Sequence, residues 1–220
     1  QDRIAQQVQY REASEFKKDK LKVLAELTKL RQICCDPHLH YADYKAGSAK
    51  LDTCMELVHG ALDGGHRILL FSQFTGMLDI IGKRLVKEDI AFLKLTGASS
   101  KESRAKMVAQ FQAGEVPVFL ISLKAGGVGL NLTAADVVIH YDPWWNVAAQ
   151  DQATDRAHRI GQQHTVTVYK LIAKDTIEER IMQMQESKRD LVNSVLGGDG
   201  ISSALFTRED VLALLGGDGR

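Results

Sequence analysis

Two arginines and a glutamine have a spacing that suits phosphate chemistry. Arg156 and Arg159 lie three residues apart, and Gln152 precedes Arg156 by four. In a predicted helix over residues 146–159, these separations place the three side chains on one face. Two neighbouring guanidinium groups can clasp the oxygens of a transferring phosphoryl group, and such an arginine finger typically accounts for about 10³ to 10⁵ in rate. The alternative is a solvated face on which Asp155 pairs with Arg159, worth roughly a few tenths of a kcal/mol.

A glycine-rich stretch follows a predicted strand end. Gly126, Gly127 and Gly129 permit positive φ and a close approach of the backbone to a phosphate, and the turn after them can present amide hydrogens. A tight turn would need the same glycines. The prediction of a phosphate contact therefore gains its weight from Ser122 and Lys124, which come immediately before them.

The only tryptophans of the chain, Trp144 and Trp145, follow Asp142 and Pro143 at the end of another predicted strand. In open α/β sheets, ligands bind outside the carboxyl ends of the strands. The pattern predicts that one tryptophan packs in the core and that the other lies at the mouth of a site.

The strings GGVGLNL, DPWWN and QATDRAHRIGQ occur in this order at close spacing. Together they resemble motifs V and VI of the Swi/Snf family of helicase-like, DNA-dependent ATPases, specifically its second RecA-like lobe. The resemblance implies that Arg156 and Arg159 reach across a cleft to ATP on the first lobe, and that Trp145 faces DNA while Trp144 packs. Val147 departs from the family pattern, in which many members have proline at the first helical position.

The resemblance covers residues 21–215. LTKLRQICCDPHLH resembles the helix that opens this lobe, LFSQF resembles motif IV, LTGASSKESR the motif after it, and TIEERI the helix that packs back across the lobes. It implies that Gln152 and Gly129 support the ATP site. The implied DNA-binding residues are Ser72, Lys124, Gly127 and Trp145.

Five short apolar or alternating runs predict strands at residues 68–71, 92–95, 118–121, 137–141 and 166–171. Helical patterns or a glycine-rich crossover separate them, at residues 76–88, 101–112, 125–130 and 146–159. This alternation predicts an α/β fold with a parallel sheet covered by helices on both faces, which the resemblance identifies as RecA-like. The alternating pattern of the last run places it nearer an edge.

Further helices are predicted at both ends. Residues 4–33 form a long helix that Pro37 ends, residues 50–62 form a short one, and Asp175 and Thr176 open another that runs to about residue 195. The resemblance would place Ser99 and Lys101 at a DNA backbone; the favoured alternative for Ser99 is the N-cap of the helix at residues 101–112, with Glu102 completing a capping box. The predicted division is an N-terminal helix over 1–40, the lobe over 41–174, and C-terminal helices over 175–220, with a last short helix at residues 202–217.

Composition limits the classes of partner. The 28 basic residues balance 28 acidic ones among 220, so DNA binding requires a local patch. Cys34, Cys35 and Cys54 form no CxxC pair, and with His38 and His40 they predict no metal site. No run of 18 apolar residues predicts a membrane span, and a chain that begins with Gln1 suggests a fragment or processed product.

No G-x-x-x-x-G-K-[ST] phosphate loop occurs, so the chain is expected to be half of an ATPase and inactive alone, with ATP and Mg²⁺ held mainly by a first lobe. We predict the second lobe of a translocase on double-stranded DNA that remodels nucleoprotein. The alternatives are a strand-separating helicase lobe and a non-catalytic protein-binding module, with a self-sufficient nucleotide enzyme least favoured. Bacterial resemblance in residues 122–146 predicts a cytoplasmic protein; a eukaryotic one would be nuclear.

Overall fold

The computed structural model describes residues 13–126, 130–144, 147–157 and 165–195. The predicted helix at 202–217 lies outside these residues. Among the helices described, none is both long and apolar enough to span a bilayer.

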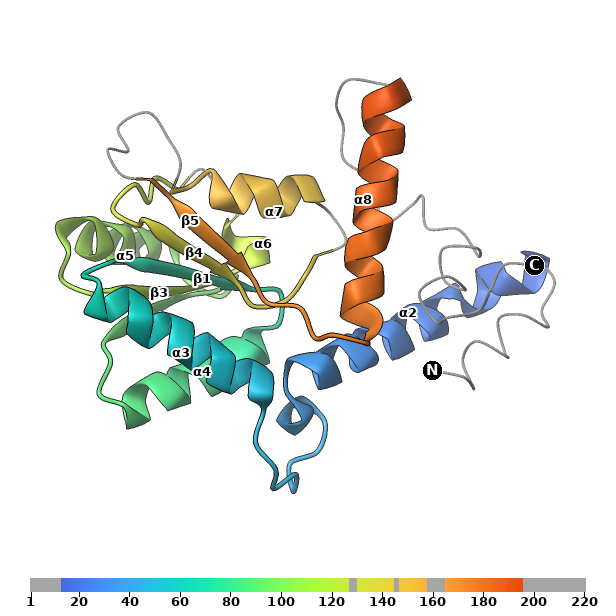
Figure 1. Ribbon diagram of the computed structural model, residues 1–220, viewed down its shortest axis with the longest axis horizontal. Coiled ribbons are helices and arrows are strands. Elements are labelled where there is room, and N and C mark those ends of the chain that lie inside the picture. The colour runs from blue at the N-terminus through green and yellow to red at the C-terminus, as the bar shows by residue number, and fades with distance from the viewer. Residues whose placement is uncertain (1–12, 127–129, 145–146, 158–164, 196–220) are drawn as a thin grey trace.

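A five-stranded parallel sheet forms the centre of the molecule, with strand order β2-β3-β1-β4-β5 (Figure 1). All five predicted strands are confirmed, and β5 is an edge strand with exposed residues, as its alternation predicted. In register, Ile68 of β1 lies between Val118 of β3 and Val137 of β4. The strands are β1 (Ile68–Ser72), β2 (Phe92–Leu95), β3 (Val118–Ser122), β4 (Val137–His140) and β5 (Thr167–Lys170).

Helices cover both faces of this sheet, because the central strands are apolar on both sides. Ile68 and Leu70 of β1 point into a core closed by α3 (Ala49–Asp63) and α4 (Thr75–Lys87). Leu69 and Phe71 point to the opposite face, into a core shared with Phe111 and Ala153. The elements on or next to that face are α5 (Lys101–Ala113), α6 (Leu123–Gly126) and α7 (Val147–Thr154). Figure 1 shows α3 and α4 below the sheet and α7 above it.

The cap of α5 differs from the prediction. Ser100 is the N-cap, and its hydroxyl accepts a hydrogen bond from Ser103 N at 3.2 Å. Ser99 lies one residue earlier, and its hydroxyl accepts from Thr96 N at 3.2 Å in the loop after β2. The prediction of a capping box between Ser99 and Glu102 is therefore wrong, because the turn after β2 uses the first serine and leaves the second for the helix.

Two long helices flank the lobe on one side of the sheet. α2 (Ala13–Cys35) ends just before Asp36 and Pro37, as predicted, and α8 (Ile177–Val195) begins directly after Thr176. In Figure 1, α2 extends away from the sheet and α8 stands beside it, and the two helices are in contact. The first turn of α8 enters the protein interior, since Ile177 and Ile181 are fully buried.

Candidate functional site

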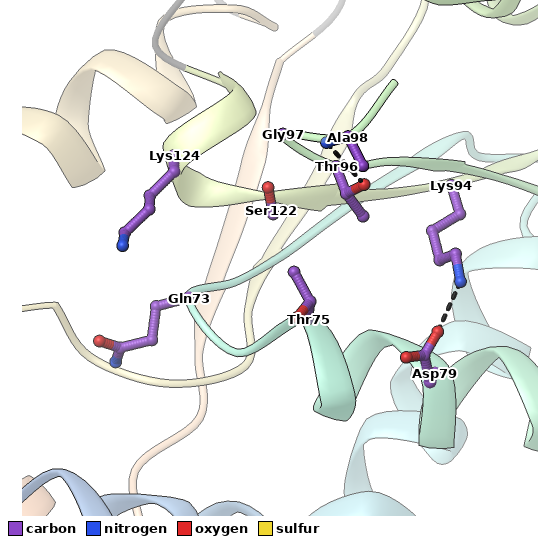
Figure 2. Close-up of a pocket in the computed structure, with 9 residues that line it drawn as sticks. All are labelled: Gln73, Thr75, Asp79, Lys94, Thr96, Gly97, Ala98, Ser122 and Lys124. Carbon is purple, nitrogen blue, oxygen red and sulfur yellow. Dashed lines mark hydrogen bonds and ion pairs between the residues drawn. The ribbon is translucent and has the colours of Figure 1, made fainter. Parts of the chain in front are cut away.

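A pocket of about 440 Å³ opens at the carboxyl ends of β1, β2 and β3 (Figure 2). The exposed side chain of Lys124 lies on one side of it together with Gln73, while Thr75 and Thr96 lie near its centre. On the other side, Lys94 is paired with Asp79 at 2.5 Å. The full lining is Gln73, Thr75, Asp79, Lys94, Thr96, Gly97, Ala98, Ser122 and Lys124. Polar groups of three strand ends therefore meet at this edge of the sheet.

Local hydrogen bonds fix the turn that carries Lys124. β3 ends at Ser122, whose buried hydroxyl accepts a bond from Ala125 N at 3.3 Å. The carbonyl of Ala125 accepts a second bond, from Arg104 Nη1 of α5, at 3.2 Å. α6 occupies only residues 123–126, so the crossover predicted over residues 125–130 begins as one short helical turn. These bonds hold the backbone on both sides of Lys124 while its charged end stays in solvent.

Asp142 organises the ends of β1 and β4. Its carboxylate accepts from the hydroxyl of Ser72 at 2.5 Å and from Gln73 Nε2 at 2.5 Å. Ser72 is fully buried and does not line the pocket. A direct DNA contact by this hydroxyl, as the sequence suggested, would require its bond to Asp142 to break. Asp142 and Gln73 both follow predicted strands, and their position there is the one signal in the sequence that could have pointed to this role.

The backbone of Pro143 and Trp144 is held by side chains from three helices and from the loop after β1. Arg31 of α2 donates to the carbonyl of Pro143, which also accepts from Gln73 Nε2 at 3.2 Å. Gln185 of α8 donates to the carbonyl of Trp144, and Trp144 N donates to Gln150 Oε1 of α7 at 3.2 Å. The Trp144 ring is partly buried against the core, as expected for the packing tryptophan.

The arginine segment departs from the predicted helix. α7 ends at Thr154, and the chain then turns so that the carbonyl of Arg156 accepts from Leu132 N at 3.0 Å. Arg156 is 3 % exposed, whereas Gln152 on α7 is exposed. The prediction that these two side chains share one face of a continuous helix is therefore wrong, because bonding to the segment after β3 ends the helix first. Four other predicted site residues lie outside the described residues: Gly127, Gly129, Trp145 and Arg159.

A buried group of charges lies close to residues 142–144, which we call the tryptophan segment. Glu178 of α8 is fully buried, pairs with Lys50 Nζ of α3 at 2.5 Å, and accepts from Ala173 N at 2.9 Å. Burial raises the pKa of Glu178 above its usual value, although Lys50 opposes the shift. Burial lowers the pKa of Arg31, which Asp142 opposes. The pair of Lys50 and Glu178 thus ties α3 to α8, while Arg31 ties α2 to the carbonyl of Pro143.

His140 of β4 links the sheet to the end of α7. Its Nε2 lies 2.9 Å from Thr154 Oγ1, and its ring stacks on Phe71 with centroids 5.5 Å apart. Burial, together with the charge of Lys170, lowers the pKa of His140 to about 4. The imidazole is therefore neutral at neutral pH and fixes Thr154 two residues before Arg156. Elsewhere in the described part of the chain, no cluster of three or more His, Cys, Asp or Glu side chains could hold a metal ion.

Comparison with known proteins agrees with this architecture. The helicase conserved C-terminal domain matches residues 49–161. An uncharacterized ATP-dependent helicase of Mycoplasma pneumoniae is 42% identical over 198 residues, covering 90% of this chain and 19% of its own. The chromatin-remodeling ATPase INO80 of Cryptococcus neoformans is 46% identical over 165 residues, covering 74% and 9%.

Among solved structures, the Sulfolobus solfataricus SWI2/SNF2 ATPase core in complex with dsDNA matches with a TM-score of 0.73 and 36% identity, over 89% of this chain and 41% of that one. The fold and site thus define a RecA-like helicase C-terminal domain. The chain belongs to the Swi/Snf family of helicase-like ATPases, as its C-terminal lobe, and the bacterial relative fits the bacterial resemblance of its motifs. It spans about a fifth of the length of the Mycoplasma relative.

Proposed function

We propose that this lobe is the second half of an ATP-dependent translocase on double-stranded DNA. The supporting observation is that two chemical features share one edge of the sheet. The pocket beside Lys124 lies at the ends of β1, β2 and β3, and β4 leads from the same edge through Trp144 and α7 to the turn at Arg156. A protein with this arrangement can contact nucleic acid at one feature and a nucleotide on a neighbouring lobe at the other.

On the DNA side, we assign the phosphate contact to Lys124, whose charge is exposed at the pocket. Gly127 would bring the backbone close to the same strand, and Trp145 would contact a sugar or the minor groove. Ser72 would act through Asp142, which joins the ends of β1 and β4. The solved relative, in complex with dsDNA, supports duplex DNA as the partner.

On the nucleotide side, Arg159 would reach the γ-phosphate of ATP held with Mg²⁺ by a first RecA-like lobe. Arg156 is nearly inaccessible to solvent in this lobe, so we assign it the tasks of holding the turn and adding positive charge in a site of low dielectric. Gln152 and Gly129 would support this site. The remodelling target would be a nucleoprotein complex, in the cytoplasm of a bacterium or in the nucleus of a eukaryote.

The test is ATP hydrolysis with and without duplex DNA by this chain, by the intact two-lobe protein, and by two variants of the intact protein. We expect the chain alone to be inactive and the intact protein to be stimulated by DNA. Arg159→Ala should lower kcat by about 10³-fold or more, the usual effect of an arginine finger. Arg84→Ala is the matched control, because Arg84 pairs with Glu88 on the surface of α4 and should leave the rates unchanged.

Two outcomes would refute this proposal. Hydrolysis by the isolated chain would mean that it holds a complete nucleotide site. Normal DNA-stimulated hydrolysis by Arg159→Ala would mean that this arginine is not the finger.

A further inference from the structure

Trp144 is held through both of its backbone hydrogen-bonding groups by side-chain amides. Gln150 of α7 accepts from Trp144 N through Oε1 at 3.2 Å, and Gln185 of α8 donates to the Trp144 carbonyl. Gln150 is only 1 % exposed. A glutamine buried to this extent is costly unless its amide is hydrogen-bonded, so this position uses a polar side chain where an apolar one would pack.

The other end of α7 leads into the turn at residues 155–157, which we call the arginine turn. The hydroxyl of Thr154 lies 3.3 Å from the carbonyl of Gln150 and 2.9 Å from His140 Nε2 of β4. Two residues later, the carbonyl of Arg156 accepts from Leu132 N. Hydrogen bonds thus connect the backbone of Trp144 to Gln150, Gln150 to Thr154, and Thr154 to the sheet.

α7 contains eight residues, so it spans about 12 Å at 1.5 Å per residue. Gln150 of α7 binds Trp144 N, and Thr154 is the last residue of the helix. The two lie four residues apart, about one helical turn, and a hydrogen bond joins them, so a shift of Gln150 is passed to Thr154. A displacement of the tryptophan segment that keeps the bond from Trp144 N to Gln150 therefore shifts the start of the arginine turn.

We propose that Gln150 is a positioning residue that couples the tryptophan segment to the arginine turn. This rests on the proposed function, in which Trp145 faces DNA and Arg159 faces ATP. DNA bound at the tryptophan segment would set the position of α7 through the Gln150 amide, and α7 would carry the arginine turn into place. Gln150 would then determine how strongly DNA accelerates hydrolysis and would touch neither DNA nor nucleotide.

The test compares the intact two-lobe protein with Gln150→Leu, which fills similar space without an acceptor for Trp144 N. The readout is the stimulation factor, the ratio of hydrolysis rates with saturating duplex DNA and without DNA. We expect Gln150→Leu to lower this factor by roughly tenfold, within the range of ordinary coupling between sites, and to change the DNA-free rate by less than about twofold. Gln150→Asn, which withdraws the amide oxygen by one methylene, should act in the same direction with a smaller effect and keeps the test possible if the leucine variant fails to fold.

The chain offers a matched control in Asp136, which lies just before β4, at the edge of the sheet opposite the pocket. Asp136 Oδ1 accepts from Arg67 N at 3.0 Å, so Asp136→Leu likewise removes a side-chain acceptor from a backbone N–H, but far from the arginine turn. It should lower thermal stability as Gln150→Leu does but leave the stimulation factor unchanged.

Three results would overturn the coupling. These are an unchanged stimulation factor in Gln150→Leu, an equal fall in its rates with and without DNA, and an equal loss of stimulation in Asp136→Leu. If DNA stimulates the wild-type protein and Arg159→Ala is inactive, any of these results refutes only the role proposed for Gln150. If DNA does not stimulate the wild-type protein, the proposed function of the lobe is refuted as well.

Discussion

The buried pair between Lys50 and Glu178 supports the sharpest stability prediction. The two charges are 2.5 Å apart, and their side chains are 9 % and 0 % exposed. At an effective dielectric constant near 20, the attraction amounts to roughly 6–7 kcal/mol, most of which offsets the cost of removing both ions from water. Lys50→Met keeps the apolar stem but leaves the Glu178 carboxylate buried without its cation. Breaking a buried pair in this way costs about 3–5 kcal/mol, so we expect a loss of that size in the free energy of unfolding at pH 7.

The pH dependence supplies an independent check. Burial raises the pKa of Glu178 and Lys50 opposes this, so Lys50→Met should raise the folded-state pKa further. A carboxyl whose pKa is raised on folding contributes stability below its unfolded pKa, and loses it as the pH rises through the folded pKa. The defect of Lys50→Met should therefore shrink as the pH falls from 7 towards 4.5, by at most about 1.4 kcal/mol per pH unit, because a protonated Glu178 needs no cation.

The measurement is urea denaturation of this chain followed by circular dichroism, with wild type and variant compared at each pH. Lys94→Met is the matched control, since Lys94 pairs with Asp79 at the same distance but with side chains 39 % and 53 % exposed. It should cost less than about 1 kcal/mol. If Lys50→Met costs no more than Lys94→Met, or if its defect does not change with pH, the argument from a desolvated ion pair is wrong.

Two further predictions concern Lys124 and His140. Lys124→Gln should weaken duplex DNA binding by the intact protein. It should also reduce the magnitude of the slope of the logarithm of the DNA-binding constant against the logarithm of salt concentration by about 0.9, the effect of one lost phosphate contact. Fluorescence anisotropy at several salt concentrations measures this slope, and an unchanged slope would show that Lys124 makes no phosphate contact. His140 has its pKa lowered on folding from 6.5 to about 4, so the unfolded chain binds more protons between these values and stability falls as the pH falls through this window. This loss in the free energy of unfolding between pH 7 and pH 4 amounts to about 3 kcal/mol. Urea denaturation at the two pH values should show it in wild type and not in His140→Gln. If the variant had the same pH dependence as wild type, the burial of a neutral imidazole would be contradicted.

The sheet could be predicted from the sequence because each strand is a local signal. An apolar run such as Val118–Ser122 is too short for a helix and lies between helical patterns. Ser122 and Lys124 come directly after the predicted strand at residues 118–121, so the rule that ligands bind at strand ends marked them as site candidates. The pocket forms where the parallel strands β1, β2 and β3 end at the same edge of the sheet. The parallel arrangement follows from the alternation of apolar runs and helical patterns along the chain.

The boundaries of α5 and α7 could not be predicted in the same way. Ser99 and Ser100 are chemically identical caps, and the choice between them depends on the turn after β2. α7 stops at Thr154 because the backbone of Arg156 bonds to Leu132, 24 residues earlier in the chain. The sequence of residues 146–159 gives no sign of that bond. Its helical pattern continues through the turn, so the end of α7 could not be predicted from it.

The roles of Gln150 and Gln185 were missed for a related reason. A buried glutamine looks like any other polar helix residue until its partner is known, and Gln185 is 41 residues from the carbonyl that it binds. Glu178 lies among polar residues in the first turn of α8, where the sequence alone gives no sign of burial. Its burial depends on Lys50, which lies 128 residues away in the chain.

These distant bonds show how the flanking helices belong to the site. Arg31 of α2 and Gln185 of α8 bind consecutive carbonyls, those of Pro143 and Trp144, immediately before the tryptophan proposed to meet DNA. α8 is in turn fixed to α3 by the pair of Glu178 and Lys50. Hydrogen bonds therefore run from α8 through the Trp144 backbone to Gln150 of α7. If Gln150 couples the two ends of α7 as proposed, a Gln185→Leu variant should also lower the DNA stimulation factor, because it removes the bond that joins α8 to Trp144.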